Sequence, residues 1–383
     1  MKETKFKQTD IGLIPEDWVS LFFGNIGPVK MCKRVMKYQT SERGDIPFYK
    51  IGTFGKEPDA FISRELYKEL KEKYSYPKKG DVLISAAGTI GRTVLFDGKD
   101  AFFQDSNIVW LENDESLVIN SYLFYLYQVV EWKTENGGIV SRLYNDNFKV
   151  TPIIFPPTIE EQERIANALS QVDDLLAALD EQIEKKQLVK QGTMQQLLTG
   201  KTRLQGFKGK WKTVKLGDVL DYEQPSNYQV LSTQYLEKGV PVLTAGKTFI
   251  LGYTAEKTGV YNKLPVIIFD DFVAESKYVD FPFKVKSSAV KMLKLKKEKD
   301  SLRFVYEIMQ IIDFVVADHK RHWISDYSLI EIKMPEPSEQ QAIANILSTM
   351  DEEIQALQEE RDKYALVKQG MMQQLLTGKI RLN

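Results

Sequence analysis

The sequence has few of the residues that build disulfide frameworks and metal centres. Its 383 residues include one cysteine, Cys32, and two histidines, His319 and His322. A single cysteine excludes an internal disulfide and most cysteine-based metal sites. The two histidines lie close together, but the sequence points to no further ligands that would complete a zinc site with them. We therefore expect this chain to bind no metal.

Long apolar runs and a charge excess are missing as well. No stretch approaches the ~20 apolar residues of a membrane-spanning helix, and the polar start MKETKFKQTD lacks the apolar segment of a signal peptide. We expect a cytoplasmic protein that does not enter a membrane. The net charge is −1, and the acidic excess lies on 159–204 and 337–383. This distribution is compatible with a nucleic-acid ligand if a partner supplies part of the phosphate neutralisation.

Near-matches to catalytic motifs fail on their defining residues. The run AAGTIGRT resembles a phosphate-binding loop, but Ala86 replaces the first glycine and Arg92 replaces the lysine. A nuclease-like pattern consists of Pro58-Asp59 followed by Glu69 and Lys71, but Glu69 and Lys71 fall in a segment typical of an exposed charged helix and not on a strand. The run FPPT (155–158) lacks the leading Asn or Asp of a methyltransferase loop, and no glycine-rich cofactor fingerprint is present. We expect the chain not to be an enzyme.

What the sequence does contain is a long internal repeat. Residues 161–204 and 339–382 align without a gap, and more than half of the aligned positions are identical. Prolines precede both copies, at Pro156 and Pro157 and at Pro335 and Pro337. Identity at this level exceeds what a shared helical pattern produces, so it indicates a duplication or a shared partner surface.

Each copy is predicted to form one long helix. Apolar residues recur at alternating steps of four and three, a period of 3.5 that places them on one narrow stripe typical of a coiled coil. Gly200 and Gly378 are expected to end the two helices. Two helices of matching length in one chain most simply pack on one another. The predicted helix-pair interface comprises Ile165, Leu169, Val172, Leu176, Leu179, Ile183, Ile343, Leu347, Met350, Ile354 and Leu357.

The segments outside the helices repeat more faintly. Trp18 leads to FGNI and Trp211 leads to LGDV at the same spacing, whereas the interiors differ almost completely. We divide the chain into module 1 (1–158), a helix (159–204), module 2 (205–336) and a second helix (337–383). Both modules are predicted to mix strands and helices. The expected strands are DVLIS, TVLF, NIVWL, PVIIFDD, FPFKV and KMLKL, and the expected helices are 63–73, 121–132 and 302–314.

Several predicted loops combine basic, amide and aromatic side chains, a mixture that suits contacts with phosphates and base edges. The candidate DNA-binding residues of module 1 are Lys33, Arg34, Lys37, Tyr38, Thr89, Arg92, Arg142 and Tyr144. Those of module 2 are Tyr222, Gln224, Tyr228, Lys247, His319, Lys320, Arg321, His322 and Trp323.

This layout resembles the specificity subunits of Type I restriction–modification enzymes. The motifs that carry the resemblance are P-x-x-x-E-Q-x-x-I-A at the start of each helix and LVKQG-x-MQQLLTGK near its end. Weaker matches lie in the modules, at 14–18, 80–85 and 321–325. The resemblance implies an α+β fold, with two mixed α/β target-recognition domains alternating with two long helices that pack as an antiparallel coiled coil.

It also implies a function and a set of partners. Each module would read one half of a split double-stranded DNA site in the major groove, and the helices would set the spacing and dock two methyltransferase subunits. Those partners would carry S-adenosylmethionine, methylate adenine and recruit a restriction subunit that uses ATP and Mg²⁺, so this chain itself would need no cofactor. Two alternatives stay open: the specificity module of another restriction–methylation system, and a coiled-coil adaptor that binds no DNA.

Overall fold

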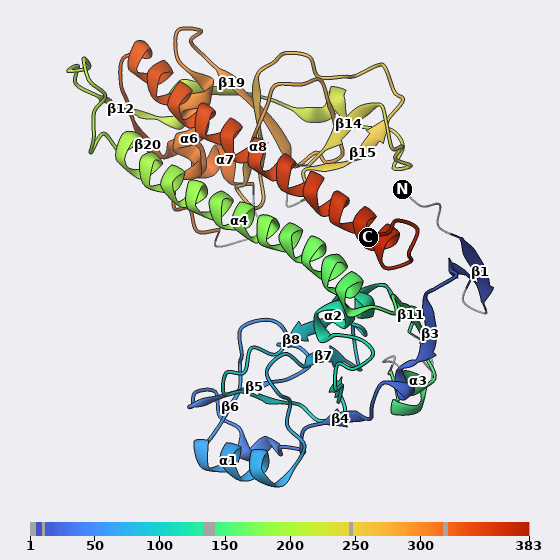
Figure 1. The fold of residues 1–383 in the computed structure, drawn as a ribbon. Coiled ribbons are helices and arrows are strands. Elements are labelled where there is room, and N and C mark those ends of the chain that lie inside the picture. The colour runs from blue at the N-terminus through green and yellow to red at the C-terminus, as the bar shows by residue number, and fades with distance from the viewer. Residues whose placement is uncertain (1–4, 10–11, 133–141, 245–247, 317–320, 383) are drawn as a thin grey trace. The chain divides into compact units, whose positions relative to one another are not determined.

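Two long helices organise the fold (Figure 1): α4 (Ile159–Leu197) and α8 (Pro337–Leu375). The computed structural model describes residues 5–9, 12–132, 142–244, 248–316 and 321–382. The chain forms two compact units. Unit 1 comprises residues 1–179 and 360–383, and unit 2 comprises 180–359. Each unit therefore contains one module, one part of α4 and one part of α8.

Module 1 is built around two small sheets. A four-stranded antiparallel sheet has the order β4-β10-β7-β8, and a three-stranded sheet has the order β6-β5-β9. A separate pair, β11 with β3, joins the end of the module to its start. The elements are β1 (Phe6–Thr9), β2 (Gly12–Pro15), β3 (Val19–Phe22), η1 (Phe23–Asn25), β4 (Val29–Met31), η2 (Lys37–Gln39), β5 (Ile46–Tyr49), β6 (Phe61–Ile62), α1 (Arg64–Lys73), β7 (Val82–Ser85), β8 (Thr93–Leu95), β9 (Phe102–Phe103), β10 (Ile108–Leu111), α2 (Asn120–Val129), α3 (Asn145–Lys149) and β11 (Pro152–Phe155).

Module 2 repeats this topology with a different sequence. Its four-stranded sheet has the order β13-β19-β16-β17, its three-stranded sheet the order β15-β14-β18, and β12 pairs with β20. In both modules the central strand of the smaller sheet has one antiparallel and one parallel neighbour. The elements are β12 (Lys212–Lys215), α5 (Leu216–Val219), β13 (Leu220–Glu223), η3 (Pro225–Tyr228), β14 (Val240–Leu243), β15 (Ile250–Thr254), β16 (Val266–Asp270), β17 (Ser276–Val279), β18 (Lys284–Val285), β19 (Val290–Leu295), α6 (Leu302–Gln310), α7 (His322–Ser325), η4 (Tyr327–Leu329) and β20 (Glu331–Met334).

The strand and helix predictions are largely confirmed, and the differences lie at element ends. The predicted helix 121–132 ends at Val129, and Trp132 instead stacks on Phe23 with 5.4 Å between ring centroids. The predicted helix 302–314 ends at Gln310, because the apolar residues that follow turn back onto the module core. Tertiary packing thus overrides the helical pattern in both places.

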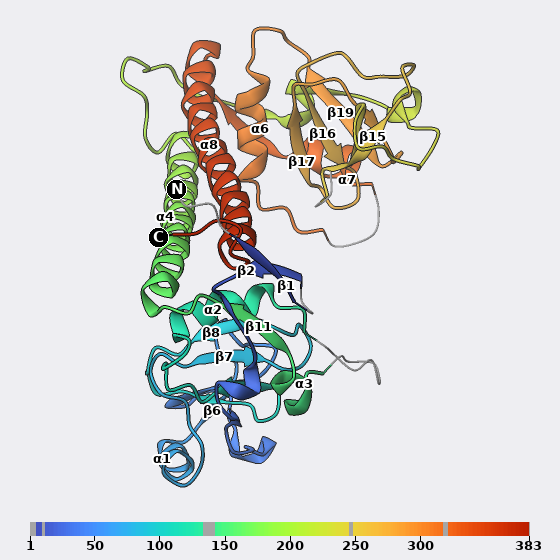
Figure 2. The ribbon, with the colours of Figure 1, turned by 45° about the vertical axis from the view of Figure 1, so that its right-hand side comes forward.

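Each unit has a core in which a module and parts of both long helices meet. In unit 1, Ile165 and Leu169 of α4 share a cluster with Leu375 of α8 and with α2. In unit 2, Leu197 of α4 packs with Ile343 of α8 and with α6. Figure 2 shows α6 lying between α8 and the sheet that contains β16 and β17. The beginning of one long helix therefore packs against the end of the other in both units, which is the predicted antiparallel arrangement.

The predicted interface stripe divides into two kinds of position. Residues at the beginning of each helix are fully buried, because they face a module as well as the other long helix. Leu179 and Ile354, further along, are 5% and 8% exposed, and the remaining stripe residues are partly buried. Stabilisation of the helices therefore comes from contacts with the modules as well as from the helix pair.

Candidate nucleic-acid interface

In module 1, three loops leave the same edge of the four-stranded sheet. The register pairs Val109 with Met31, Ile108 with Ser85 and Ile84 with Thr93. Because neighbouring strands run in opposite directions, the loop after β4, the loop before β10 and the β7–β8 loop must emerge together. We call these three loops (32–38, 86–92 and 104–107), together with residues 142–144, which are hydrogen-bonded to the β7–β8 loop, the edge loops of module 1.

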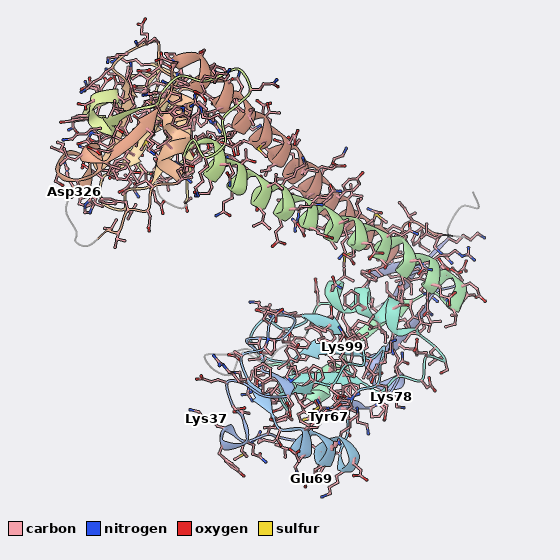
Figure 3. The ribbon with its side chains drawn as sticks, turned by 90° about the vertical axis from the view of Figure 1, so that its left-hand side faces the viewer. Lys37, Tyr67, Glu69, Lys78, Lys99 and Asp326 are labelled. Carbon is pink, nitrogen blue, oxygen red and sulfur yellow. The ribbon has the colours of Figure 1, made fainter. Side chains whose placement is uncertain are left out.

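Backbone hydrogen bonds join these loops into one surface. The amide of Ala86 donates to the carbonyl of Asn107 at 2.7 Å, and the amide of Leu143 donates to the carbonyl of Ala86 at 2.9 Å. The second bond places Arg142, which is exposed, directly beside the β7–β8 loop. Figure 3 marks Lys37, a further candidate residue, on the surface of this module.

Module 2 builds the same edge from different residues. The amide of Asp271 donates to the carbonyl of Ala289 at 3.0 Å, and the amide of His322 donates to the carbonyl of Asp271 at 2.9 Å. Asp271 thus takes the place of Ala86, and Arg321 takes the place of Arg142. We call residues 224–229, 271–275, 286–289 and 321–323 the edge loops of module 2. Both arginines are exposed, so two residues far apart in the sequence occupy equivalent positions.

The other candidates in module 1 differ in how freely they can meet a ligand. Tyr38 is 83% exposed, whereas Arg34 donates to Asp105 at 2.8 Å. The Nζ of Lys33 lies 4.7 Å from the ring centre of Tyr74. Arg92 is partly buried and donates to the carbonyl of Phe54 at 3.1 Å, which gives it a role in holding its own loop. Lys37, Thr89 and Tyr144 are exposed on the edge loops.

In module 2, burial contradicts the prediction that His322 and Trp323 contact DNA. The side chains of His322 and Trp323 are each 2% exposed, and Trp323 packs on Phe269 with 5.2 Å between ring centroids. These two residues form the inner side of the short helix α7, so they belong to the core and do not face a ligand. Lys247, His319 and Lys320 lie outside the described residues.

The remaining candidates of module 2 frame the same edge. Gln224 is exposed, and the hydroxyl of Tyr228 donates to Glu223 at 2.7 Å. Tyr222 is partly buried with the ammonium group of Lys291 4.8 Å from its ring centre. The buried ion pair between Lys291 and Asp271, 2.9 Å apart, could not be predicted from the sequence. These partners are distant in the sequence and belong to no motif.

The residues of the internal repeat have two separate roles. The first is to join the segment after one long helix to the start of the other helix within each unit. Arg203 donates twice to Glu339, at 2.6 Å each, and Arg381 donates to both carboxylate oxygens of Glu161. The carboxylates of Glu161 and Asp17 raise the pKa of the Arg381 guanidinium. Alignment of the repeat could have revealed these bonds, because both ends of each pair are repeated.

Two further positions of the repeat, a lysine and an aspartate, link the two long helices within each unit. Lys368 lies 2.6 Å from Asp173 in unit 1, and Lys190 lies 2.6 Å from Asp351 in unit 2. The module supplies a different third partner each time. Tyr125 donates to Asp173 at 2.8 Å, whereas Arg303 binds Asp351.

A second set of repeated residues points to solvent. Leu188 and Leu366 occupy the same repeat position and are 61% and 70% exposed. Val189 and Val367 follow them at 52% and 42% exposure. We call these four residues the Leu–Val faces. Contacts among the residues that the structure describes do not account for their identity, and repeated exposed apolar residues of this kind are typical of a surface that binds a partner.

Comparison with known proteins gives the family. The model of the Type I restriction modification DNA specificity domain matches residues 15–187 and 208–363. The chain belongs to this family. A putative Type I restriction enzyme specificity subunit of Haemophilus influenzae is 59% identical over 158 residues, which are 41% of this chain and 41% of that protein. The match thus spans about two fifths of that relative's length.

More distant relatives match along the whole chain. The putative MjaX specificity subunit of Methanocaldococcus jannaschii is 27% identical over 419 residues, covering 100% of this chain and 98% of that protein. The crystal structure of a Type I restriction–modification S subunit from M. genitalium superposes with a TM-score of 0.66 at 16% identity, covering 97% and 98% of the two chains. This likeness confirms the family's fold: two mixed modules and two long helices.

Within the described ranges, no group of three or more His, Cys, Asp or Glu side chains is arranged to hold a metal ion. Among the helices of the same residues, none is both long and apolar enough to cross a membrane.

Proposed function

We propose that this chain is the DNA-recognition subunit of a Type I restriction–modification enzyme, with one module for each half of a bipartite site. The observation that carries the proposal is the equivalence of the two module edges. The same topology presents Arg142 on one edge and Arg321 on the other, among loops whose sequences differ. Like scaffolds with unlike loops suit two readers of two different half-sites.

The Leu–Val faces support a second part of the proposal, which is assembly. They occur once per helix copy, so the chain offers two equivalent apolar surfaces. Two copies of one partner would satisfy both, and we assign them to two methyltransferase subunits. We propose that these partners supply S-adenosylmethionine and adenine methylation in the cytoplasm, and that a restriction subunit adds ATP and Mg²⁺. In this scheme the chain performs no catalysis itself.

The test uses the chain purified together with its methyltransferase subunits. Mapping of methylated adenines gives the bipartite sequence, and binding to that site is expected to weaken steeply with salt. Arg142→Ala should relax one half-site and Arg321→Ala the other, each by about 1–3 kcal/mol. Lys212→Ala, an exposed charge on β12, serves as the control. If each arginine variant altered both half-sites equally, the assignment of one module to each half would be wrong.

A direct assay addresses the catalytic assignment. The purified chain alone, supplied with DNA and S-adenosylmethionine, is expected to leave the DNA unmethylated, and addition of the methyltransferase subunits should restore methylation. Methyl transfer by the isolated chain would contradict the proposal.

A further inference from the structure

The turn between β16 and β17 exposes two apolar side chains. Phe272 is 41% exposed and Val273 is 51% exposed, and they are adjacent at the tip of the turn. The neighbouring strand residues are buried, so the exposure is confined to the tip. Asp270 and Asp271 separate these residues from the apolar run of the preceding strand.

The backbone of this turn is held firmly. The carboxylate of Asp270 accepts hydrogen bonds from the amides of Phe272 and Val273, at 2.9 and 3.2 Å. Ala274 adopts a φ of 56°, a left-handed conformation that is unfavourable for a residue with a side chain. Below the tip, Asp271 is fixed by Lys291 and by the amide of Trp323, at 2.9 and 2.8 Å. The two apolar side chains are therefore presented on a preorganised support.

Exposed positive groups lie in both segments that are hydrogen-bonded to Asp271, and the exposed carboxylate of Glu275 follows the tip in the turn itself. Arg321 is exposed next to His322, whose amide donates to the carbonyl of Asp271. The loop before β19 carries the exposed Lys286 and supplies the carbonyl of Ala289 to the amide of Asp271. Positive groups beside a small apolar tip match a DNA groove, where phosphates flank the base edges.

The equivalent turn in module 1 lacks such a tip. Its β7–β8 loop carries Thr89 at the surface, and the apolar Ile90 is partly buried against the module core. The two modules thus present different side chains at this equivalent turn. A difference of this kind is expected where two related readers contact different bases.

We propose that Phe272 and Val273 contact the C5-methyl group of a thymine in the half-site read by module 2. In the major groove this methyl group is the apolar feature that distinguishes thymine, and apolar side chains recognise it by contact. The inference rests on the proposed function, since it requires module 2 to read DNA. It adds the base and the chemical group that this turn recognises.

The experiment removes the methyl group from the DNA and the apolar side chains from the protein. The affinity of the complex with its methyltransferase subunits is measured for the mapped DNA site. Arg321→Ala identifies the half-site that module 2 reads, and each thymine of that half-site is replaced in turn by uracil. At one position uracil should weaken binding by roughly fourfold, the effect of losing one buried carbon group. The double variant Phe272→Ala, Val273→Ala should bind the thymine and uracil sites equally.

Controls separate failure of this inference from failure of the proposed function. Leu329→Ala removes an apolar side chain of similar exposure, 53%, from η4 outside the edge loops, and should keep the uracil effect. If no thymine occurs in this half-site, if uracil is neutral everywhere, or if the double variant keeps the full uracil effect, the thymine contact is wrong while the proposed function stands. If the wild-type complex did not distinguish its half-sites from other sequences, both the thymine contact and the proposed function would be wrong.

Discussion

The guanidinium of Arg381 donates to both carboxylate oxygens of Glu161, so residues that follow α8 hold the first turn of α4. The same guanidinium binds Asp17 at 2.8 and 2.9 Å and lies 5.7 Å from the ring centre of Trp18. Arg203 forms the corresponding contacts with Glu339 and Trp211 in unit 2. In each unit, one arginine therefore joins the segment after one long helix to the first turn of the other.

Arg381→Ala should destabilise unit 1, because it leaves the buried carboxylate of Glu161 without its partner. We expect a loss of about 2–4 kcal/mol in the free energy of unfolding, measured by urea denaturation. Lys379→Ala, which removes a neighbouring exposed charge, should have little effect. An unchanged unfolding curve for Arg381→Ala would show that the pair contributes no net stability.

Trp323→Ala should destabilise module 2 by about 3–5 kcal/mol, the usual cost of truncating a buried aromatic side chain. Arg321→Ala should leave thermal unfolding unchanged and alter only half-site recognition, because its side chain is exposed. Trp323→Phe keeps an aromatic ring in the core and should be milder. If Trp323→Ala retained full stability but lost DNA binding, the ring would be a ligand contact after all.

The carboxyl group of Glu307 should make the free energy of unfolding of unit 2 depend on pH. Burial raises its pKa above 4.5, against the opposing effects of Lys190 and Arg303, while Asp351 raises it further. The folded state thus holds this proton more tightly than the unfolded state, and stability falls as pH rises from about 4.5 through the raised pKa. Glu307→Gln should flatten this part of the curve. The check is the difference between wild-type and variant unfolding free energies at several pH values, which cancels the other carboxyl groups.

The Leu–Val faces should control the number of partner subunits. Leu188→Glu or Leu366→Glu should each reduce methyltransferase binding from two copies to one, and the double variant should bind none. Folding should be retained, because both side chains are exposed. Native mass spectrometry of the purified complexes measures the copy number. A double variant that still carries two methyltransferase subunits would place the docking surface elsewhere.

The helices should set the distance between half-sites, but only if both are changed. Each unit ties α4 to α8 by its own ion pair, Lys368 with Asp173 and Lys190 with Asp351. Four residues inserted after Leu179 alone would force α4 to buckle between these ties. Four inserted there and four after Glu359 lengthen both helices by roughly 6 Å. Methylation mapping should then show a spacer longer by one or two base pairs of about 3.4 Å each, with unchanged half-sites. An active double-insertion variant with the original spacer would contradict this role of the helices.

The long helices were predictable because a 3.5-residue period over many turns has few other interpretations. The partners of Ile165 and Ile343 were not, since the same apolar position can face a second helix or a module core. Trp323 shows a second limit. A basic and aromatic cluster indicates an exposed binding loop, yet one turn of helix directs Arg321 outward and Trp323 inward, and only the packed structure distinguishes them. The equivalence of Arg142 and Arg321 was hidden because the loops around them share almost no sequence.

The division of the chain between units has a consequence for its synthesis. Unit 2 is continuous in sequence, whereas unit 1 needs residues 360–383 to join residues 1–179. Its core includes Leu375 and Leu376, and Gly378 packs so closely on Pro15 that a Cβ atom there would lie 2.4 Å from the proline ring. On the ribosome, the module that is made first therefore keeps part of its apolar core uncovered until the end of α8 has emerged, while module 2 and its helix segments complete their fold earlier.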